Sequence, residues 1–187
     1  PDYYFGDTGP GGGLVYYIKS AASDGWRYFE AFSSDNGVLP WDTANNSANS
    51  VLVGTSLEIG TGQANTTAIV NRLGTGSYSA RTCSDLSSGG KSDWFLPSQK
   101  ELYYMYELHA AGLGSFSASP PNNSSISYWS SSEASGMNGP TKDAAFQYFD
   151  SSYSINKNQQ SRKTINFHWL WCHMTFLVYS NKCKHSS

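Results

Sequence analysis

The feature that most constrains this chain is a pair of aromatic residues next to a run of serines and a carboxylate, with turns on both sides. It covers residues 127–133 and reads Ser-Tyr-Trp-Ser-Ser-Ser-Glu. Tyr and Trp favour a half-buried pleated surface, so a strand is predicted here. Prolines, asparagines and glycines at 120–123 and 136–140 are typical of the turns that end strands. A second strand is predicted over residues 144–149, antiparallel to the first, after a loop of about ten residues, which is longer than a usual hairpin turn.

Another pair of strands is predicted near the N-terminus. Residues 14–18 follow a glycine cluster at 6–13, and residues 26–32 alternate large apolar and polar side chains after a turn at 23–25. The glycine cluster lacks the Gly-Lys-Ser/Thr ending of a phosphate-binding loop and no helical pattern follows it, so a tight turn is predicted. The pattern leaves the core-facing set of the second strand open, between Trp26 with Tyr28 and Phe29 with Phe32.

Two helices are predicted between these strand pairs. The first covers residues 61–73 and ends at Gly74, the residue type that commonly closes helices. The second starts at Ser98, which forms a Ser-x-x-Glu capping box with Glu101, and ends at Gly112. Each helix has one face for packing. The first face holds Ala64, Ala68, Ile69 and Leu73, and the second holds Leu102, Met105, Tyr106 and His109.

No residue pattern indicates catalysis, a metal or a cofactor. His109 can be a packed residue at the edge of the core or a catalytic base, and we favour the packed position. The four histidines come without a nucleophile motif, and His168 and His173 would lie on opposite faces of a strand. The three cysteines form no Cys-x-x-Cys pair, and Cys83 is predicted to be a buried thiol. Glu133 could bind calcium, but as a lone carboxylate it is predicted to be a hydrogen-bonding strut.

Length and composition favour one domain with an exposed, binding character. The 187 residues suit a single domain covering 1–187, and a net charge of −2 with no basic stripe argues against nucleic acid as a partner. There is no apolar run long enough for a membrane span and no signal peptide at the start. Aromatic residues make up 15% of the chain and accompany many Ser, Gly and Asn residues. That mixture is typical of binding loops, and equally of a β-rich domain with many turns.

The C-terminal part changes character after residue 149. Residues 150–166 are polar with little periodicity, and residues 167–179 are strongly apolar. The apolar stretch is predicted to form one or two buried closing strands. Residues 182–187 are predicted to be a frayed tail.

Five motifs occur in an order that resembles a known family. They are the glycine cluster at 6–13, Gly-Trp-Arg-Tyr at 25–28, Gly-Gln-Ala-Asn-Thr-Thr at 62–67, Asp-Trp-Phe-Leu-Pro-Ser at 93–98 and Tyr-Trp-Ser-Ser-Ser-Glu at 128–133. Together they resemble the domain at the C-terminus of bacterial collagen-like adhesins, which has the C-type lectin fold of the formylglycine-generating-enzyme type. The resemblance covers residues 5–150. It implies an α+β fold with two helices beside small antiparallel sheets, and ligand binding without catalysis.

The C-terminus departs from that family, and the departure resembles the variable proteins of diversity-generating retroelements. In such proteins a reverse transcriptase rewrites adenines in the codons of a C-terminal cassette, here about residues 143–174. Codons of the form AAC can reach Phe, Tyr, Asp, Ser, Ile and Asn, but not Trp, Met, Gln or Lys. The residues predicted on this basis to contact ligand are Phe146, Tyr148, Asp150, Ser152, Tyr153, Ser154, Asn156 and Asn158. The simpler interpretation is an ordinary strand followed by a polar loop.

Phe146, Tyr148 and Asp150 alternate along the chain and would share one strand face, while Phe149 would lie on the other face, in the core. The function expected from this resemblance is the display of a diversified surface that binds a protein receptor, on the exterior of a virion or a cell. The alternative is a fixed adhesin domain that binds glycans or matrix. An enzyme of the formylglycine-generating type ranks last, because Cys172 and Cys183 are only loosely placed for that chemistry.

Overall fold

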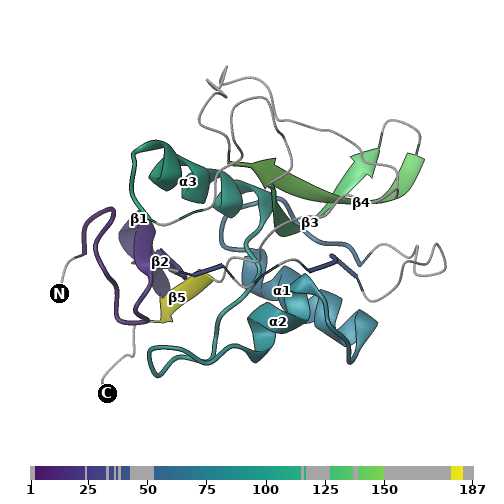
Figure 1. Cartoon of the computed structure of the whole chain (residues 1–187), viewed down its shortest axis with the longest axis horizontal. Helices are drawn as coiled ribbons and strands as arrows, with labels where there is room; N and C mark the ends of the chain where they lie inside the picture. The colour runs from purple at the N-terminus through teal and green to yellow at the C-terminus, as the bar shows by residue number, and fades with distance from the viewer. Residues whose placement is uncertain are drawn as a thin grey trace.

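The computed structural model describes residues 3–23, 25–32, 34–35, 37, 39–42, 53–114, 116, 127–136, 139–149 and 178–182. In these residues the chain forms two antiparallel sheets and three helices (Figure 1). The mixed α+β class predicted from the sequence is confirmed. The elements are β1 (Leu14–Ser23), β2 (Trp26–Ala31), α1 (Gly62–Leu73), α2 (Ser79–Asp85), α3 (Gln99–Ala110), β3 (Ser127–Gly136), β4 (Gly139–Tyr148) and β5 (Val178–Lys182).

The first sheet has the order β1-β2-β5, with β2 in the middle. Trp26, Tyr28, Phe29 and Ala31 of β2 are all buried, so both faces of this strand contribute to the interior. The sequence pattern left the core-facing set open because a strand covered on both sides has no single apolar face. Phe32 follows β2, half-buried, with its ring against Trp94 at a centroid distance of 5.5 Å.

Strand β5 closes the sheet from the far end of the chain. Val178 pairs with Ala31 and Lys182 pairs with Trp26. The prediction that the frayed tail begins at Lys182 is therefore wrong, because main-chain pairing to β2 extends the ordered strand to that residue. Of the apolar stretch at 167–179, only residues 178 and 179 lie within the described part, and both belong to β5.

Helix α1 starts and ends within one residue of its prediction, and its buried face overlaps the predicted one in part. Ile69 is buried as predicted and Ala68 and Leu73 are half-buried, but Ala64 is exposed, and Gly62, Asn65 and Thr66 are buried instead. The face differs because two polar side chains are satisfied in the interior. Asn65 bonds Ser56 through both its amide nitrogen and its carbonyl oxygen, at 2.7 and 2.9 Å. Thr66 Oγ1 donates to the carbonyl of Gly62 and accepts from the N–H of Leu96.

Helix α3 confirms the predicted capping box. Ser98 Oγ accepts from the N–H of Glu101 at 3.3 Å, and Glu101 Oε2 accepts from the N–H of Ser98 at 2.7 Å. Leu102 and Met105 are buried, as predicted for this face, and His109 is half-buried.

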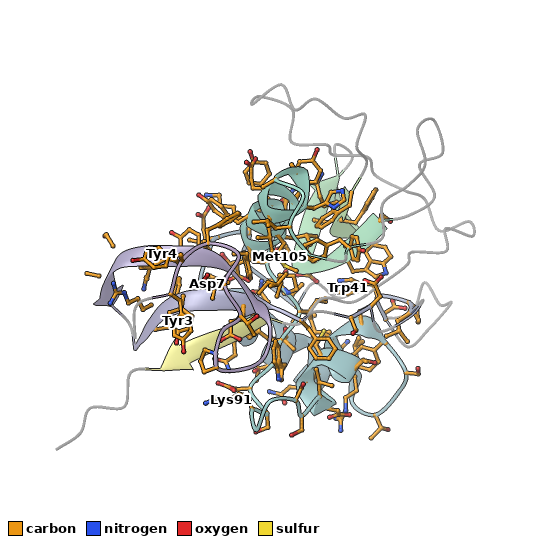
Figure 2. The ribbon with its side chains drawn as sticks, turned by 60° about the vertical axis from the view of Figure 1, so that its left-hand side comes forward. Tyr3, Tyr4, Asp7, Trp41, Lys91 and Met105 are labelled. Atoms are coloured by element: carbon orange, nitrogen blue, oxygen red, sulfur yellow. The ribbon has the colours of Figure 1, made fainter. Side chains whose placement is uncertain are left out.

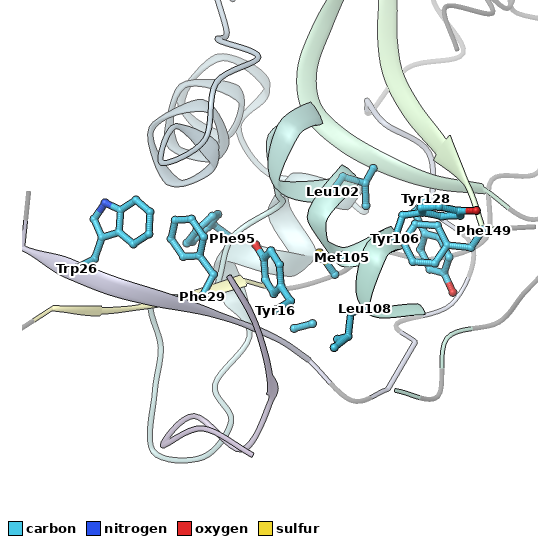
Figure 3. Packing of buried hydrophobic residues seen from close by; sticks show 11 residues of the cluster. Tyr16, Trp26, Phe29, Phe95, Leu102, Met105, Tyr106, Leu108, Tyr128 and Phe149 are labelled. Atoms are coloured by element: carbon cyan, nitrogen blue, oxygen red, sulfur yellow. The ribbon is translucent and has the colours of Figure 1, made fainter. Parts of the chain in front are cut away.

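Helix α3 contacts β1 on one side and the β3–β4 hairpin on the other. Its apolar face lies in one cluster of aromatic and aliphatic residues, with Trp26 at one end and Phe149 at the other (Figure 3). Figure 2 shows Met105 in the middle of the molecule, between Tyr3 and Tyr4 on one side and Trp41 on the other.

The β3–β4 pair is confirmed as antiparallel, but it is longer than predicted. Ser127 pairs with Tyr148 at one end and Gly136 pairs with Gly139 at the other. The connection is therefore far shorter than the predicted loop. Turn-forming residue types misled the prediction, since main-chain pairing continues past Glu133 to Gly136 through a register irregularity between Ala134 and Gly136. Pro140 is compatible with a strand that pairs on one side only.

Helix α2 is too short to leave a periodic signal and was not predicted. Its Cys83 is fully buried, which confirms the predicted buried thiol. Burial raises the pKa of this thiol well above its usual value, so it stays protonated and unreactive at neutral pH.

Candidate functional site

The candidate site is the β3–β4 hairpin together with the point where the chain leaves β4, because the predicted contact residues start there. Phe146 is 7% exposed and its ring packs edge-on against Trp129 at a centroid distance of 6.0 Å. The main chain of Tyr148 pairs with Ser127. Asp150, Ser152, Tyr153, Ser154, Asn156 and Asn158 lie outside the described residues. Phe146 thus acts as a packing residue in this structure, and the contact role of the other positions stays a prediction.

Phe149 follows β4 directly and is fully buried, which confirms its predicted place in the core. Its ring meets four others, with centroid distances of 4.4 Å to Tyr128, 5.4 Å to His109, and 5.6 Å to both Tyr106 and Phe116. We call these five residues the anchor cluster. Buried aromatic pairs of this kind add about 0.5–1.5 kcal/mol each beyond the area they bury. The chain is therefore fixed at Phe149, which lies between the predicted contact residues Tyr148 and Asp150.

The serines of β3 form hydrogen bonds with the scaffold. Ser130 Oγ donates to the carbonyl of Ala145 on β4 at 2.8 Å. The N–H of Ser131 donates to the carbonyl of Pro97 at 2.7 Å. Ser132 Oγ donates to the carbonyl of Ser56 and accepts from the N–H of Gln99. All three side chains are buried, so they connect β3 to β4, to the start of α3 and to the segment before α1.

Glu133 acts as the predicted hydrogen-bonding strut. Its carboxylate accepts from the N–H groups of Val53, Gly54 and Thr55 at 2.7, 2.9 and 3.2 Å. The N–H of Glu133 donates in return to Thr55 Oγ1 at 2.7 Å. Hydrogen bonds to an ionised group are about twice as strong as neutral ones. Glu133 thereby holds residues 53–55 against the outer part of the hairpin.

Two tryptophans join the hairpin to residues 39–41. The indole N–H of Trp41 donates to the carbonyl of Ser130 at 2.8 Å. The indole N–H of Trp129 donates to the carbonyl of Leu39 at 3.1 Å. Each indole is half-buried, and its only donor is used by a main-chain acceptor. Both rings therefore stand in fixed orientations beside β3.

Glu101 plays for α1 the part that Glu133 plays for the hairpin. Besides its capping bond, it accepts from the N–H of Gly60 at 2.7 Å and from the N–H of Gly62 at 3.3 Å. A Cβ at Gly62 would lie 2.3 Å from Glu101 Oε2, so only glycine allows this approach. Burial raises the pKa of Glu101 to about 7, although hydrogen bonds from Ser98, Gly62 and Gly60 lower it.

Glu30 does the same for the glycine cluster. Its carboxylate accepts from the N–H groups of Gly11 and Gly13 at 3.0 and 3.2 Å. A Cβ at Gly9 would lie 2.2 Å from Glu30 Cδ, so the loop closes on the carboxylate itself. Burial raises the pKa of Glu30 to about 7, against the effect of those two N–H groups and of Lys91. The predicted turn is confirmed, and its inward-pointing N–H groups donate to the carboxylate of Glu30 on the neighbouring strand.

Glu30, Glu101 and Glu133 are three carboxylate clamps, each binding the N–H groups of a loop distant in the chain. The local sequence predicts Glu133 as a strut and Glu101 as a helix cap, but it predicts neither the role of Glu30 nor the loop contacts of Glu101. The sequence feature that could have indicated the role of Glu30 is a carboxylate within an apolar strand, in a chain rich in glycine turns. A buried carboxylate needs N–H donors, and glycine turns supply them in concave sets.

These carboxylates all accept from main-chain N–H groups. His109 is the one histidine in the described part of the chain, and its half-buried ring lies against those of Phe116 and Phe149. Within the same ranges, no three His, Cys, Asp or Glu side chains are grouped so as to hold a metal ion. No helix among them has the length and apolarity needed to cross a membrane.

Comparison with known proteins gives no relative whose function could be transferred to this chain. No family model, no curated protein and no solved structure matches the chain. Its function therefore has to be argued from its own residues.

Proposed function

We propose that this chain is a display domain of the C-type lectin type, whose residues 143–174 form a diversified surface that binds a protein receptor. It acts outside the cell, on a virion or a cell surface. The observation that carries the proposal is that the chain is fixed at two points, one within and one after residues 143–174. Phe149 is fully buried within that range, and Val178 pairs with Ala31 of the central strand after it.

A segment that changes in sequence needs supports that do not depend on it. The described supports come from upstream residues. Phe149 packs on rings from α3, β3 and Phe116, and the hairpin is held by Ser130, Ser131, Ser132 and Glu133. A rigid scaffold that positions variable loops is the general arrangement of binding proteins.

The composition of the segment supports a binding role. Residues 146–158 read Phe-Gln-Tyr-Phe-Asp-Ser-Ser-Tyr-Ser-Ile-Asn-Lys-Asn. Tyr provides a large contact area with little loss of conformational entropy, and Ser and Asn provide adaptable hydrogen bonds. A protein receptor is favoured because aromatic residues of this kind are enriched in protein interfaces.

Deep sequencing of this gene from a natural population tests the diversification. We expect substitutions confined to adenine-containing codons within residues 143–174, above an unchanged scaffold that includes Phe149 and the three carboxylate clamps. Variation spread evenly along the chain, or none at all, would refute diversification. A fixed adhesin would then be the remaining reading, and calcium-independent hits on a glycan array would identify it.

Binding measurements with a receptor recovered by selection provide the second test. Tyr153→Ala and Tyr148→Ala should weaken binding and leave the Tm nearly unchanged. Tyr4→Ala is the matched control, since Tyr4 is 74% exposed and lies near the N-terminus, on the side opposite Trp41 (Figure 2). A large drop in Tm with unchanged binding at positions 148 and 153 would show that these tyrosines are structural.

A further inference from the structure

The anchor cluster contains one ionisable ring that can change its charge near neutral pH. His109 lies stacked on Phe149, with a centroid distance of 5.4 Å and an interplanar angle of 28°. Phe116 meets the imidazole edge-on at 6.1 Å, and Tyr106 lies at 6.2 Å. The imidazole is thus held among apolar ring surfaces.

No charged partner compensates for this environment among the described residues. The titratable side chain facing His109 from its own helix is Tyr106, and the one behind Phe149 is Tyr128 of β3. Tyr128 in turn donates its hydroxyl to Asp35 at 3.3 Å. Phe116, from the segment after α3, carries no charge. Burial is the cause that lowers the pKa of His109, and neither a carboxylate nor an ammonium group adds to it.

We propose that protonation of His109 loosens the anchor cluster, so that mild acid releases the ring of Phe149 from its neighbours. A proton on the imidazole puts a charge beside three rings, those of Phe149, Phe116 and Tyr106, without a counter-ion among the described residues. A cation over an aromatic face gains about 0.5–2 kcal/mol, but burial acts against it and prevails here.

The direction of the pH effect follows from linkage. The histidine pKa is lower in the closed cluster than in the open one, where it has its usual value of 6.5. Opening therefore takes up a proton, and acid favours the open state. Each unit by which the closed-state pKa is lowered makes opening about tenfold more favourable below both pKa values.

For the proposed function, this means that the diversified segment would hold its ligand less well in an acidic compartment. That consequence rests on the proposed function, whereas the loosening of the anchor cluster does not. The test therefore uses the free protein and needs no receptor.

The experiment is hydrogen exchange of the backbone amides in residues 127–129 and 146–149, at about pH 7.5 and about pH 5, corrected for intrinsic exchange. His109→Phe is the key variant, because it keeps a ring of similar shape that cannot be charged. His109→Leu replaces it if the Phe variant fails to fold. Glu101 at the other end of α3 also titrates near this range, so amides of β2 around Phe29 serve as the internal reference.

We expect the wild-type anchor amides to open severalfold more often in acid, and the His109→Phe variant to lose that change. The imidazole of His109, followed by NMR, should titrate below its usual pKa. The proposal is overturned if the variant keeps the same pH dependence, or if His109 titrates at or above its usual pKa. A failure of population sequencing to show diversification would leave these results untouched.

Discussion

The two halves of the interior are stabilised by different interactions. Around Phe29, the space between the first sheet and α3 is filled by rings, with Trp26 stacked at 4.0 Å and Phe95 edge-on at 5.9 Å. Around Asn65, hydrogen-bonded polar side chains, including Ser131 at 3.2 Å, lie between α1 and β3, beside a second apolar cluster that contains Ile69. Burial of apolar area has no preferred direction, whereas each hydrogen bond requires one donor and one acceptor in line. In the ring-filled half, replacing one apolar side chain by another of different shape should therefore cost little stability. In the polar half, replacing a single hydrogen-bonding atom should cost more.

The largest effect is expected in the ring-filled half, from truncation. Phe29→Ala should lower the free energy of unfolding by about 3–5 kcal/mol, because it removes the ring between Trp26 and Phe95. Phe29→Leu should cost clearly less, because leucine refills most of the volume. Urea denaturation at neutral pH measures both. If Phe29→Leu lowers the free energy of unfolding as much as Phe29→Ala does, ring packing here depends on direction. The ring-filled half would then be as sensitive to shape as the polar half is to hydrogen bonding.

The second effect is expected in the polar half, from a change that keeps the shape. Glu101→Gln should lower the free energy of unfolding by about 1.5–3 kcal/mol, because the amide nitrogen cannot accept from the N–H groups of Gly60, Gly62 and Ser98. Lys100→Gln, the neighbouring exposed position, is the control and should change stability by less than about 0.5 kcal/mol. Denaturation curves in urea provide the values. A cost no larger than that of the control would mean that the clamp at Glu101 contributes little.

The third effect sharpens the role of the buried carboxylates. The pKa of Glu30 is raised to about 7 by burial, so its stabilising contribution is complete below its unfolded-state pKa and is lost as pH rises through about 7. The stability of the wild type should fall by about 1–2 kcal/mol relative to that of Glu30→Gln between about pH 5 and pH 8. Parallel denaturation series in both proteins would show it. A difference that stays constant with pH would place the pKa of Glu30 outside this range.

The smallest effect concerns a single atom in the ring-filled half. Tyr16 is buried and its hydroxyl has no hydrogen-bond partner among the described residues. Tyr16→Phe should leave the free energy of unfolding unchanged or raise it by up to about 1 kcal/mol, since an unsatisfied buried hydroxyl is removed. Thermal denaturation followed by circular dichroism would measure this. A clear loss of stability would show that this hydroxyl has a partner in solution and that the half is less uniformly apolar.

Prediction from the sequence worked best where one short stretch contains all the information. The capping box of Ser98 and Glu101 was found, because both partners lie within one turn of helix. The β1–β2 turn at Gly25 and the C-terminal cap at Gly74 were found for the same reason. Phe149 was placed in the core from strand alternation alone. The packing position favoured for His109 agrees with its ring contacts, although no hydrogen bond of its side chain is present in the described part.

Prediction failed where the partner lies far along the chain. The buried face of α1 was wrong in part: Ile69 is buried as predicted, but hydrogen bonds with Ser56 and Ser131 make Asn65 an interior residue. Phe146 was placed on the contact face by alternation, whereas its ring packs against that of Trp129 and only 7% of the residue is exposed. The length of the β3–β4 hairpin was underestimated, because residue types near Gly136 describe a turn while main-chain pairing continues. In each case a long-range contact overrides a local preference.

Helix caps, glycine turns and strand alternation could thus be read directly from the residues, since they depend on neighbours within a few positions. The carboxylate clamps and the anchor cluster could not. Glu30 meets Gly11, Glu133 meets Gly54, and Phe149 meets His109 only after the chain has folded back on itself. Whether a buried carboxylate is satisfied or an imidazole is surrounded by rings depends on directional contacts and desolvation, and both exist only in the packed molecule.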